Sequence, residues 1–311
     1  MHDSTFTFES ADGQQVFCRR WAGAAAPRAV VQIAHGASEH AARYARVAHA
    51  LVDAGYEVYA NDHRGHGDTA ARFGQFGVAR PGGWAGLVAD QHALTTQIKT
   101  EHPAVPIVLF GHSMGSMIAQ DYIQQWSGDL AGVVLSGTTG ASVVDDATLQ
   151  MIVDFGAGEA ADQPSELFGA MFAGFNAPFD GPDASGFEWL SRDEGEVAKY
   201  VEDPDCGEPL SNGFVADMLS GSSTMWQPEN EARIAHDLPV YLFSGENDPV
   251  GGEKAESVVA LAARYREMGI GSVTLRIYSD GRHEMLNETN RTDVHQDLLN
   301  WLATLDTPPA G

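Results

Sequence analysis

The stretch 107-IVLFGHSMGSMIAQ-120 decides how the rest of the chain is interpreted, because it contains a Gly-x-Ser-x-Gly pentapeptide around Ser113. Glycine makes up 34 of the 311 residues, so chance alone would place roughly 0.2 such pentapeptides in a chain of this composition. The motif therefore indicates a nucleophile only in a particular context. A buried strand must precede it, a helix must follow it, and an acid and a histidine must come later in the chain.

The residues on either side of the pentapeptide meet the first two conditions. The continuous apolar run 106-PIVLF-110 predicts a buried strand that leads directly into the motif. After Ser113, apolar residues recur on one side of a predicted helix: Met114, Met117, Ile118, Tyr122 and Trp126. We therefore expect Ser113 to lie at the turn between a strand and a helix.

Short apolar runs alternate with amphipathic stretches on both sides of the motif, as is typical of a mostly parallel sheet with helices on both faces. An opening hairpin is predicted around the turn 11-ADGQ-14. Buried strands are predicted at residues 29–36, 57–61, 132–137, 239–245 and 272–279. Helices are predicted at residues 41–56, 84–103 and 253–268, with a last one ending in DLLNWLATL.

The alternation fails between residues 141 and 235, where Gly, Phe, Met, Asp and Pro dominate and no strand is evident. A region of this length inside a regular α/β chain is better explained by an inserted, mostly helical lid than by a loop. We therefore predict one α/β core, made of residues 1–140 and 236–311, with residues 141–235 as a lid. The stretch 168-FGAMFAGFNAPF-179 fits either a groove for an acyl chain or plain core.

Two later segments supply the acid and the histidine. A serine hydroxyl becomes a nucleophile when a histidine takes its proton and an acid orients that histidine. Asp248 follows one predicted strand, in 244-SGENDPV-250, and His283 follows the next, in 280-DGRHEMLNE-288. Catalytic loops of open α/β sheets lie at the carboxyl ends of the strands. The order Ser113, Asp248, His283 therefore predicts a catalytic triad.

An acyl-transfer site also needs two N–H groups aimed at the oxyanion that develops on the carbonyl oxygen. One is expected from Met114, the residue after the nucleophile, at a helix N-terminus. The second is expected from the loop after an early strand, and 35-HGASEH-40 occupies that place. We assign Ala37 as this donor.

The motifs HGASEHAARY, DHRGHGD, GHSMGS, SGENDPVGG and GRHEMLNE occur in this order. Together they resemble the α/β-hydrolases of the monoacylglycerol lipase and lysophospholipase family, which is often grouped with the serine aminopeptidases. The resemblance implies an α/β-hydrolase fold with the same triad and oxyanion donors. It also implies that Glu39, Arg43 and His112 form the polar pocket for the glycerol or head-group side of an ester.

The resemblance covers most of the chain outside the lid. Within the lid, 187-FEWLSRDEGEV-197 is similar to bacterial members of the same group, but the match is weakest there. One departure is Ser116, where the family usually has Gly after the pentapeptide. Serine is still small enough for close approach of helix and sheet, so the expected fold is unchanged and substrate preference is the property in question.

The function predicted from these residues is a serine hydrolase that cleaves carboxylic esters through an acyl-enzyme on Ser113, as a monoacylglycerol lipase or lysophospholipase. Such chemistry needs neither a metal nor an organic cofactor. The alternatives are a peptidase, a C–C bond hydrolase or a cofactor-free perhydrolase on the same fold, and a non-catalytic binding protein. Serine at position 113 argues against the dehalogenases and epoxide hydrolases, which use a carboxylate nucleophile. Glu246 is the alternative acid if Asp248 points away.

Two further groups of residues could suggest other sites. His63 and His66 with Asp62 and Asp68 have metal-ligand types, but they follow a strand in a Gly-rich turn, which favours a structural loop over a metal cluster. Cys18 and Cys206 are too few and too far apart for a disulfide framework, and no CxxC offers a metal site.

The bulk composition excludes several classes of partner. A net charge of -25 with 18 Lys and Arg argues against nucleic acid and against stable docking to an anionic membrane. The N-terminus has no apolar signal region, and no window has the apolar length of a membrane span. We therefore expect a soluble, cytoplasmic protein that meets a small ester or lipid, with at most transient contact with a lipid surface. The oligomeric state is left open.

Overall fold

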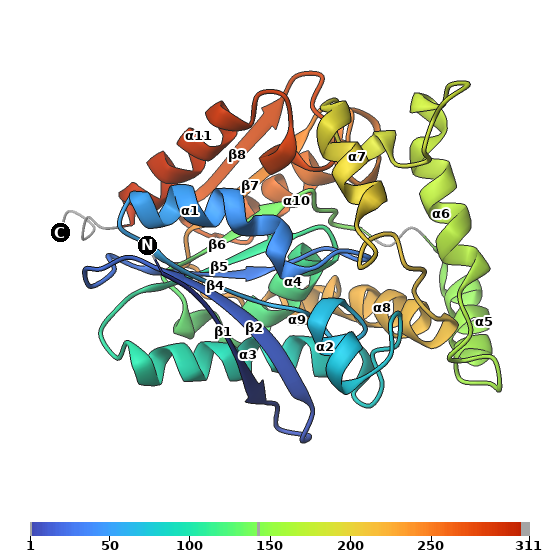
Figure 1. The fold of residues 1–311 in the computed structure, drawn as a ribbon, viewed down its shortest axis with the longest axis horizontal. Coiled ribbons are helices and arrows are strands. Elements are labelled where there is room, and N and C mark those ends of the chain that lie inside the picture. Colours follow the sequence, from blue (N-terminus) through green and yellow to red (C-terminus); the bar gives the residue numbers. More distant parts are fainter. Residues whose placement is uncertain (1, 142–143, 306–311) are drawn as a thin grey trace.

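The computed structural model describes residues 2–141 and 144–305, and an eight-stranded sheet forms its centre (Figure 1). The strand order is β1-β2-β4-β3-β5-β6-β7-β8. The strands are β1 (His2–Glu9), β2 (Gln15–Ala22), β3 (Val30–Ala34), β4 (Glu57–Asn61), β5 (Ile107–His112), β6 (Gly132–Ser136), β7 (Val240–Gly245) and β8 (Val273–Tyr278). Strands β1 and β2 form the predicted hairpin, and β2 is antiparallel to β4. All other pairs are parallel, so the predicted mostly parallel sheet is confirmed.

Helices cover both faces of this sheet. On one face lie α1 (Ala45–Asp53) and α11 (Arg291–Thr304), and on the other lie α3 (Gly83–Glu101), α4 (Met114–Trp126) and α10 (Glu256–Glu267). Successive residues of a strand point to opposite faces. In β5, Phe110 packs in the core under α1 and α11, whereas Leu109 packs in the core under α4. Both faces are buried, which explains the continuous apolar runs in the sequence.

One helix of the core was not predicted. Helix α2 (Gly67–Phe73) begins inside the stretch that the sequence indicates as a Gly-rich loop. The buried carboxylate of Asp62 accepts hydrogen bonds from the amides of Ala41 and Asp68, each at 2.8 Å. This carboxylate holds two backbone segments together, which fits the structural interpretation of the DHRGHGD turn.

The chain between β6 and β7 is mainly helical, and we call its residues 144–235 the cap. Its helices are α5 (Asp146–Gly156), α6 (Glu166–Asn176), α7 (Glu194–Glu202), α8 (Asn212–Met225) and α9 (Pro228–Glu231). Helices α5 and α6 form the outer edge of the molecule, on the far side of α7 and α8 from most of the sheet (Figure 1). Residues 142 and 143 of the predicted lid lie outside the described part of the chain.

Short 3-10 turns complete the described structure. They are η1 (Ala41–Tyr44), η2 (Ser127–Asp129), η3 (Ala177–Phe179), η4 (Glu188–Leu190), η5 (Pro249–Gly251), η6 (Glu253–Ala255) and η7 (Met285–Asn287). Of the helices in the described ranges, none combines the length and the apolar character that crossing a membrane would require.

Candidate active site

Ser113 lies in a strained turn between β5 and α4. Its backbone has φ 52° and ψ -122°, a conformation that residues other than glycine rarely adopt and that is frequent at functional sites. The two glycines of the pentapeptide permit this turn. A Cβ on Gly111 would lie 2.3 Å from the carbonyl oxygen of Gly115, and a Cβ on Gly115 would lie 2.1 Å from that of Ala34. The motif therefore sets a sharp strand-to-helix turn with Ser113 at its tip.

Asp248 and His283 form a buried pair at the ends of β7 and β8. The Nδ1 of His283 lies 2.9 Å from Asp248 Oδ1, and the side chains are 0% exposed for Asp248 and 2% exposed for His283. An ionised carboxylate only accepts hydrogen bonds, so Nδ1 carries the proton and Nε2 is left to accept one. The amide of Val250 and the hydroxyl of Ser244 also donate to Asp248, at 3.0 and 3.1 Å. These contacts fix the carboxylate toward the imidazole.

Glu246, the alternative acid, points to a different group. Its carboxylate accepts hydrogen bonds from the hydroxyl of Ser279 at 3.1 Å and from the amide of Asp280 at 3.3 Å. The geometry thus pairs Asp248, and not Glu246, with the histidine.

The surroundings of the histidines separate their protonation states. Burial by itself would lower the pKa of His283, but the charge of Asp248 and its hydrogen bond outweigh burial and raise that pKa. The neighbouring His112 is also buried, and burial together with the charge of His283 lowers its pKa to about 4. His112 is therefore neutral at pH 7, when His283 is the more basic ring.

The loop after β3 passes beside Ser113. A Cβ on Gly36 would lie 3.1 Å from the Cβ of Ser113, so this loop reaches the turn that carries the serine. The carboxylate of Glu39 accepts a hydrogen bond from the amide of Gly36 at 2.6 Å, which holds the loop in a tight bend. Ala37 and Met114 both line the cavity that contains Ser113 and His283. The two predicted oxyanion donors therefore belong to residues of the serine's own cavity.

A small polar cavity adjoins this one and contains the three residues predicted for the head group. Glu39, Arg43 and His112 line it together with Glu284. The guanidinium of Arg43 donates to Glu39 at 2.6 Å and to both carboxylate oxygens of Glu284 at 2.6 and 2.8 Å. Burial opposes ionisation of Glu284, but the charge of Arg43 outweighs burial and lowers the pKa of Glu284 to about 2. The predicted residues thus lie together, but the positive charge of Arg43 is already compensated.

The cavity around Ser113 is largely apolar, and much of its wall comes from the cap. Cap residues that line it are Phe168, Met171, Phe172, Phe175, Trp189, Leu190, Tyr200, Met218, Leu219, Ser222 and Trp226. Four of these come from the stretch 168–179, whose aromatic residues fitted either a groove or plain core. These side chains give the site a surface that suits a hydrocarbon chain.

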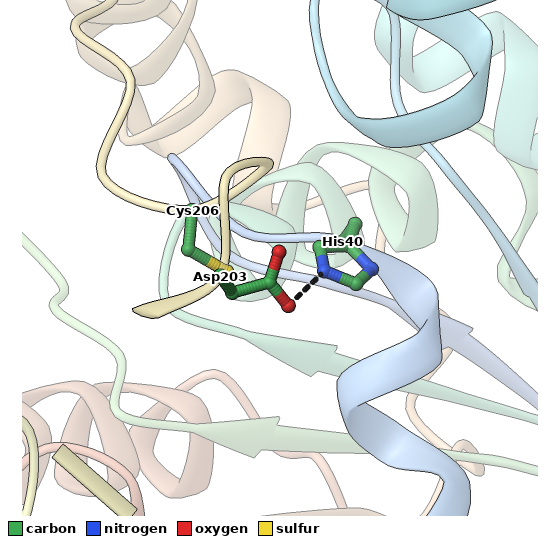
Figure 2. A group of neighbouring side chains, drawn as sticks. All are labelled: His40, Asp203 and Cys206. Carbon is green, nitrogen blue, oxygen red and sulfur yellow. Dashed lines mark hydrogen bonds and ion pairs between the residues drawn. The ribbon is translucent and has the colours of Figure 1, made fainter. Parts of the chain in front are cut away.

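The cap is fastened to the loop after β3 by the group His40, Asp203 and Cys206 (Figure 2). The Nε2 of His40 lies 3.0 Å from Asp203 Oδ2, and the ligand atoms of all three side chains lie within 4.8 Å of one another. Burial raises the pKa of the Cys206 thiol, so the thiol is protonated at pH 7. Close by, the amide of Gly207 donates to the carbonyl oxygen of Ser38 at 2.9 Å. The group therefore joins the cap to this loop, residues 35–40, which we call the oxyanion loop after its predicted donor Ala37.

Two residues beside His283 were not assigned a role in the site from the sequence. Glu284 directly follows His283 and pairs with Arg43, and its position next to the histidine was the available signal. Trp189 of the cap packs against His283, with ring centroids 4.7 Å apart and 35° between the planes. It lies in the segment 187-FEWLSRD-193, where the apolar residues have no regular period that would indicate which way the Trp189 side chain points.

A mostly parallel sheet with helices on both faces, a serine on a sharp turn after β5 and a later acid–histidine pair define an α/β-hydrolase. The family described as serine aminopeptidase, S33, matches residues 25–290. The chain belongs to this family.

Several known proteins are similar over nearly their whole length. A monoacylglycerol lipase of Mycolicibacterium smegmatis is 28% identical over 304 residues, which cover 97% of each chain. The solved structure of a thermostable carboxyl esterase from Bacillus coagulans in complex with glycerol has a TM-score of 0.90 and 26% identity, and covers 99% of this chain and 100% of that one. A lipase solved in an open form has a TM-score of 0.86 and 31% identity with the same coverage.

Proposed function

We propose that the protein hydrolyses carboxylic esters through an acyl-enzyme on Ser113, and that its substrate is a monoacylglycerol. The observation that carries this proposal is the buried pair of Asp248 and His283, 2.9 Å apart, in one apolar cavity with a serine held on a strained turn. Ser113, Asp248 and His283 are the catalytic triad in this proposal.

In the first half of the reaction, the Ser113 hydroxyl attacks the ester carbonyl while His283 Nε2 takes its proton. The negative charge on the carbonyl oxygen is stabilised by the amides of Ala37 and Met114. Met114 is the first residue of α4, so its amide has no acceptor within the helix and benefits from the helix dipole. His283 then gives the proton to the leaving alcohol oxygen, and the acyl group stays on Ser113.

In the second half, His283 takes a proton from water, which attacks the acyl-enzyme. The tetrahedral intermediate collapses as His283 returns the proton to Ser113, and the carboxylic acid leaves. Asp248 keeps the imidazole in one tautomer and stabilises its protonated form in both halves.

The apolar wall of the cap suits the acyl chain, and the polar cavity favours an uncharged head group. Among the described residues that line the two cavities, the single Arg or Lys is Arg43. Two carboxylates already pair with it, so a phosphate would find no unpaired cation there. A glycerol head group would instead need only hydrogen bonds. This argues for a monoacylglycerol over a lysophospholipid.

The names of similar proteins support the same proposal. The relative from Mycolicibacterium smegmatis is named a monoacylglycerol lipase, and the structure from Bacillus coagulans is a carboxyl esterase in complex with glycerol. In this proposal the cap acts as a lid that covers the acyl chain, and the core comprises residues 1–140 and 236–311.

A serine-directed fluorophosphonate probe tests the mechanism. We expect it to label the native protein at Ser113 and to leave Ser113→Ala unlabelled. Ser116→Ala is the matched control, since it removes a hydroxyl three residues away and should still be labelled. Equal labelling of native protein and Ser113→Ala would refute the proposed nucleophile.

A matched substrate panel tests the substrate class. It compares a monoacylglycerol, a lysophosphatidylcholine and an amide with the same acyl chain at equal concentration. We expect the highest kcat/KM for the monoacylglycerol. Faster cleavage of the amide would indicate a peptidase, and faster cleavage of the lysophospholipid would show that the head-group argument is wrong.

A further inference from the structure

His283 lies between two aromatic rings, one from the core and one from the cap. The ring centroid of His112 lies 4.7 Å from that of His283, with 47° between the planes. On the cap side, Trp189 lies 4.7 Å from His283, with 35° between the planes. Trp189 is buried and lines the cavity that contains Ser113. A residue of the cap therefore contacts His283 itself, in addition to lining the cavity proposed for the acyl chain.

The backbone around Trp189 is bonded to the loop that carries the base. The amide of His283 donates to the carbonyl oxygen of Trp189 at 3.2 Å, and the amide of Glu284 donates to that of Leu190 at 2.7 Å. The guanidinium of Arg282 donates to the carbonyl oxygen of Glu188 at 2.6 Å. Three successive residues of the base loop thus bind three successive residues of the cap.

The indole itself is held by packing. Behind it, Phe172 and Phe175 of α6 lie with ring centroids 5.2 and 5.1 Å from Trp189. None of the residues that the structure describes accepts a hydrogen bond from the buried indole N–H. The position of the ring is therefore set by the aromatic residues on one side and by His283 on the other.

This contact has a chemical consequence if His283 is the base. In both halves of the proposed reaction the imidazole becomes an imidazolium, and an indole face attracts a cation that is shielded from water. The other titratable groups that face His283 are Asp248, His112, Glu284 and Glu39. The carboxylates favour the charged ring, while His112 is neutral and adds no repulsion.

We propose that Trp189 is a positioning residue for His283: its indole face holds the imidazole against Asp248 and stabilises the imidazolium during acyl transfer. This inference rests on the proposed function of His283. It means that the cap segment 188–191 is a fixed part of the catalytic centre, so that opening of the cap leaves this segment in place.

Replacement of the indole by side chains of different character tests this role. Trp189→Leu keeps an apolar residue but removes the aromatic face, whereas Trp189→Phe keeps a smaller aromatic face. A modest cation–π contact changes the pKa of the ring by about half a unit, which is about threefold in the protonation constant. We therefore expect the acid limb of the kcat/KM profile on a short ester to move about half a pH unit lower in Trp189→Leu, with kcat roughly threefold lower. Trp189→Phe should lie between this variant and the native protein.

The direction of the shift distinguishes this role from simple shielding. Burial lowers the pKa of His283, so a variant that only admits water would move the acid limb to higher pH. Trp226→Leu is the matched control, because Trp226 lines the same cavity but donates its indole N–H to Gln120 at 3.0 Å. It should change KM and leave the acid limb in place.

A titration that needs no turnover separates this proposal from the proposed function. The imidazole protons of His283 are followed by NMR against pH in Ser113→Ala and in Ser113→Ala with Trp189→Leu. We expect a pKa about half a unit lower in the double variant. An unchanged or higher pKa would overturn the role of Trp189 even if the protein is an esterase. A lower pKa without ester hydrolysis by the native protein would instead leave the contact intact and refute the proposed function.

Discussion

The carboxyl edge of the sheet and the cap build one cavity, but they hold their residues in different ways. At the sheet edge, Ser113, Asp248 and His283 each follow the end of a parallel strand, so the backbone of the sheet sets their spacing. In the cap, Phe172 and Trp189 come from segments joined to the core by hydrogen bonds and ring contacts. In the proposed function, the sheet would determine the reaction type, and packing in the cap would determine the choice of acyl chain.

The largest effect is expected at the sheet edge, from Asp248→Asn. The amide cannot hold the protonated Nδ1 of His283 as the carboxylate does, so we expect kcat to fall by about 10⁴-fold. KM and the melting temperature should change little, because the cap and its cavity are untouched. Steady-state kinetics measures kcat and KM, and a thermal melt measures the melting temperature.

Glu246→Gln is the control for this variant. Its carboxylate binds Ser279 and Asp280 on the surface, so activity should stay within about twofold of the native value. If Glu246→Gln loses activity while Asp248→Asn stays nearly active, the acid that pairs with His283 is Glu246 and not Asp248.

The sequence predicted the sheet edge well because its signals are local. A buried strand gives a continuous apolar run, and the residue just after it must lie at the carboxyl edge. This placed Ser113, Asp248 and His283 without any knowledge of how the helices pack. Helix α2 was missed because Gly65 and Gly67 suggest a loop, whereas the helix depends on Asp62, which accepts its hydrogen bond from a residue six positions on.

The cap could be predicted only as a helical segment between two strands. The contacts of its helices join residues distant in the sequence, such as Ser165 and Leu210. The spacing of apolar residues along such a helix shows which face is buried, but it does not indicate which neighbouring element covers that face. The sequence therefore contained no signal that Trp189 would lie on His283, or that Asp203 would meet His40.

The second prediction concerns acid stability, which should be set by the core and not by the cap. At the start of the loop after β3, His35 is buried together with His63 and His66, and the ring centroids of His35 and His63 lie 4.1 Å apart. Burial lowers the pKa of His63 to about 3 and that of His66 to about 4, from 6.5. The unfolded chain therefore takes up protons that the folded chain does not. The folded state is therefore destabilised as the pH falls below 6.5, down to about 4 for His66 and about 3 for His63, by roughly 3 kcal/mol for each histidine at pH 4.

Urea unfolding at three pH values between neutral and mildly acidic measures this loss. Carboxylates also titrate near the lower end of this range, so the comparison is made between variants. His63→Gln removes one of the titrating groups and should reduce the slope of the unfolding free energy with pH by up to about 1.4 kcal/mol per unit. Gln296→Ala, at an exposed glutamine that does not titrate, is the control and should leave the slope unchanged. Equal slopes in all three proteins would exclude the buried cluster as the cause.

A third prediction tests how the cap is joined to the core. Asp203→Asn removes the charge from the hydrogen bond to His40, which links the cap to the oxyanion loop (Figure 2). We expect this to weaken the junction by about 1 kcal/mol, since hydrogen bonds to charged groups contribute slightly more than neutral ones. Hydrogen exchange at residues 194–212 should accelerate about fivefold, while amides of β5 and β7 keep their protection.

Asp205→Asn, two residues away, is the control and should leave exchange at residues 194–212 unchanged. A chelator and added Zn²⁺ provide a second check, since His40, Asp203 and Cys206 have ligand types that a metal could use. We expect neither to change the melting temperature, because a metal would have to displace the proton of the partly buried Cys206 thiol. A melting temperature that rises with Zn²⁺ in the native protein, and not in Cys206→Ser, would assign the junction to a metal instead.

The smallest effect is expected at Ser116, which replaces the glycine usual after the pentapeptide. Its hydroxyl donates to the carbonyl oxygen of Ser113 at 2.6 Å and lies 2.7 Å from Thr138 Oγ1. Thr138 keeps a second bond from Gln120, at 2.9 Å, so removal of the Ser116 hydroxyl leaves it partnered. We therefore expect Ser116→Ala to cost about 1 kcal/mol of stability and to lower kcat less than about fivefold.

A double-mutant cycle with Thr138→Val shows whether the Ser116 hydroxyl acts on the turn of the nucleophile or only on the packing below it. Melting temperature and kcat are measured for both single variants and for the double variant. If the two hydroxyls act as a pair, their effects on stability will be less than additive, while kcat stays nearly constant. If Ser116→Ala alone instead slows turnover about a hundredfold, the Ser116 hydroxyl holds the turn that carries Ser113. The position of Ser113 would then depend on a side-chain contact, as the positions of the cap residues do, and not on the sheet backbone alone.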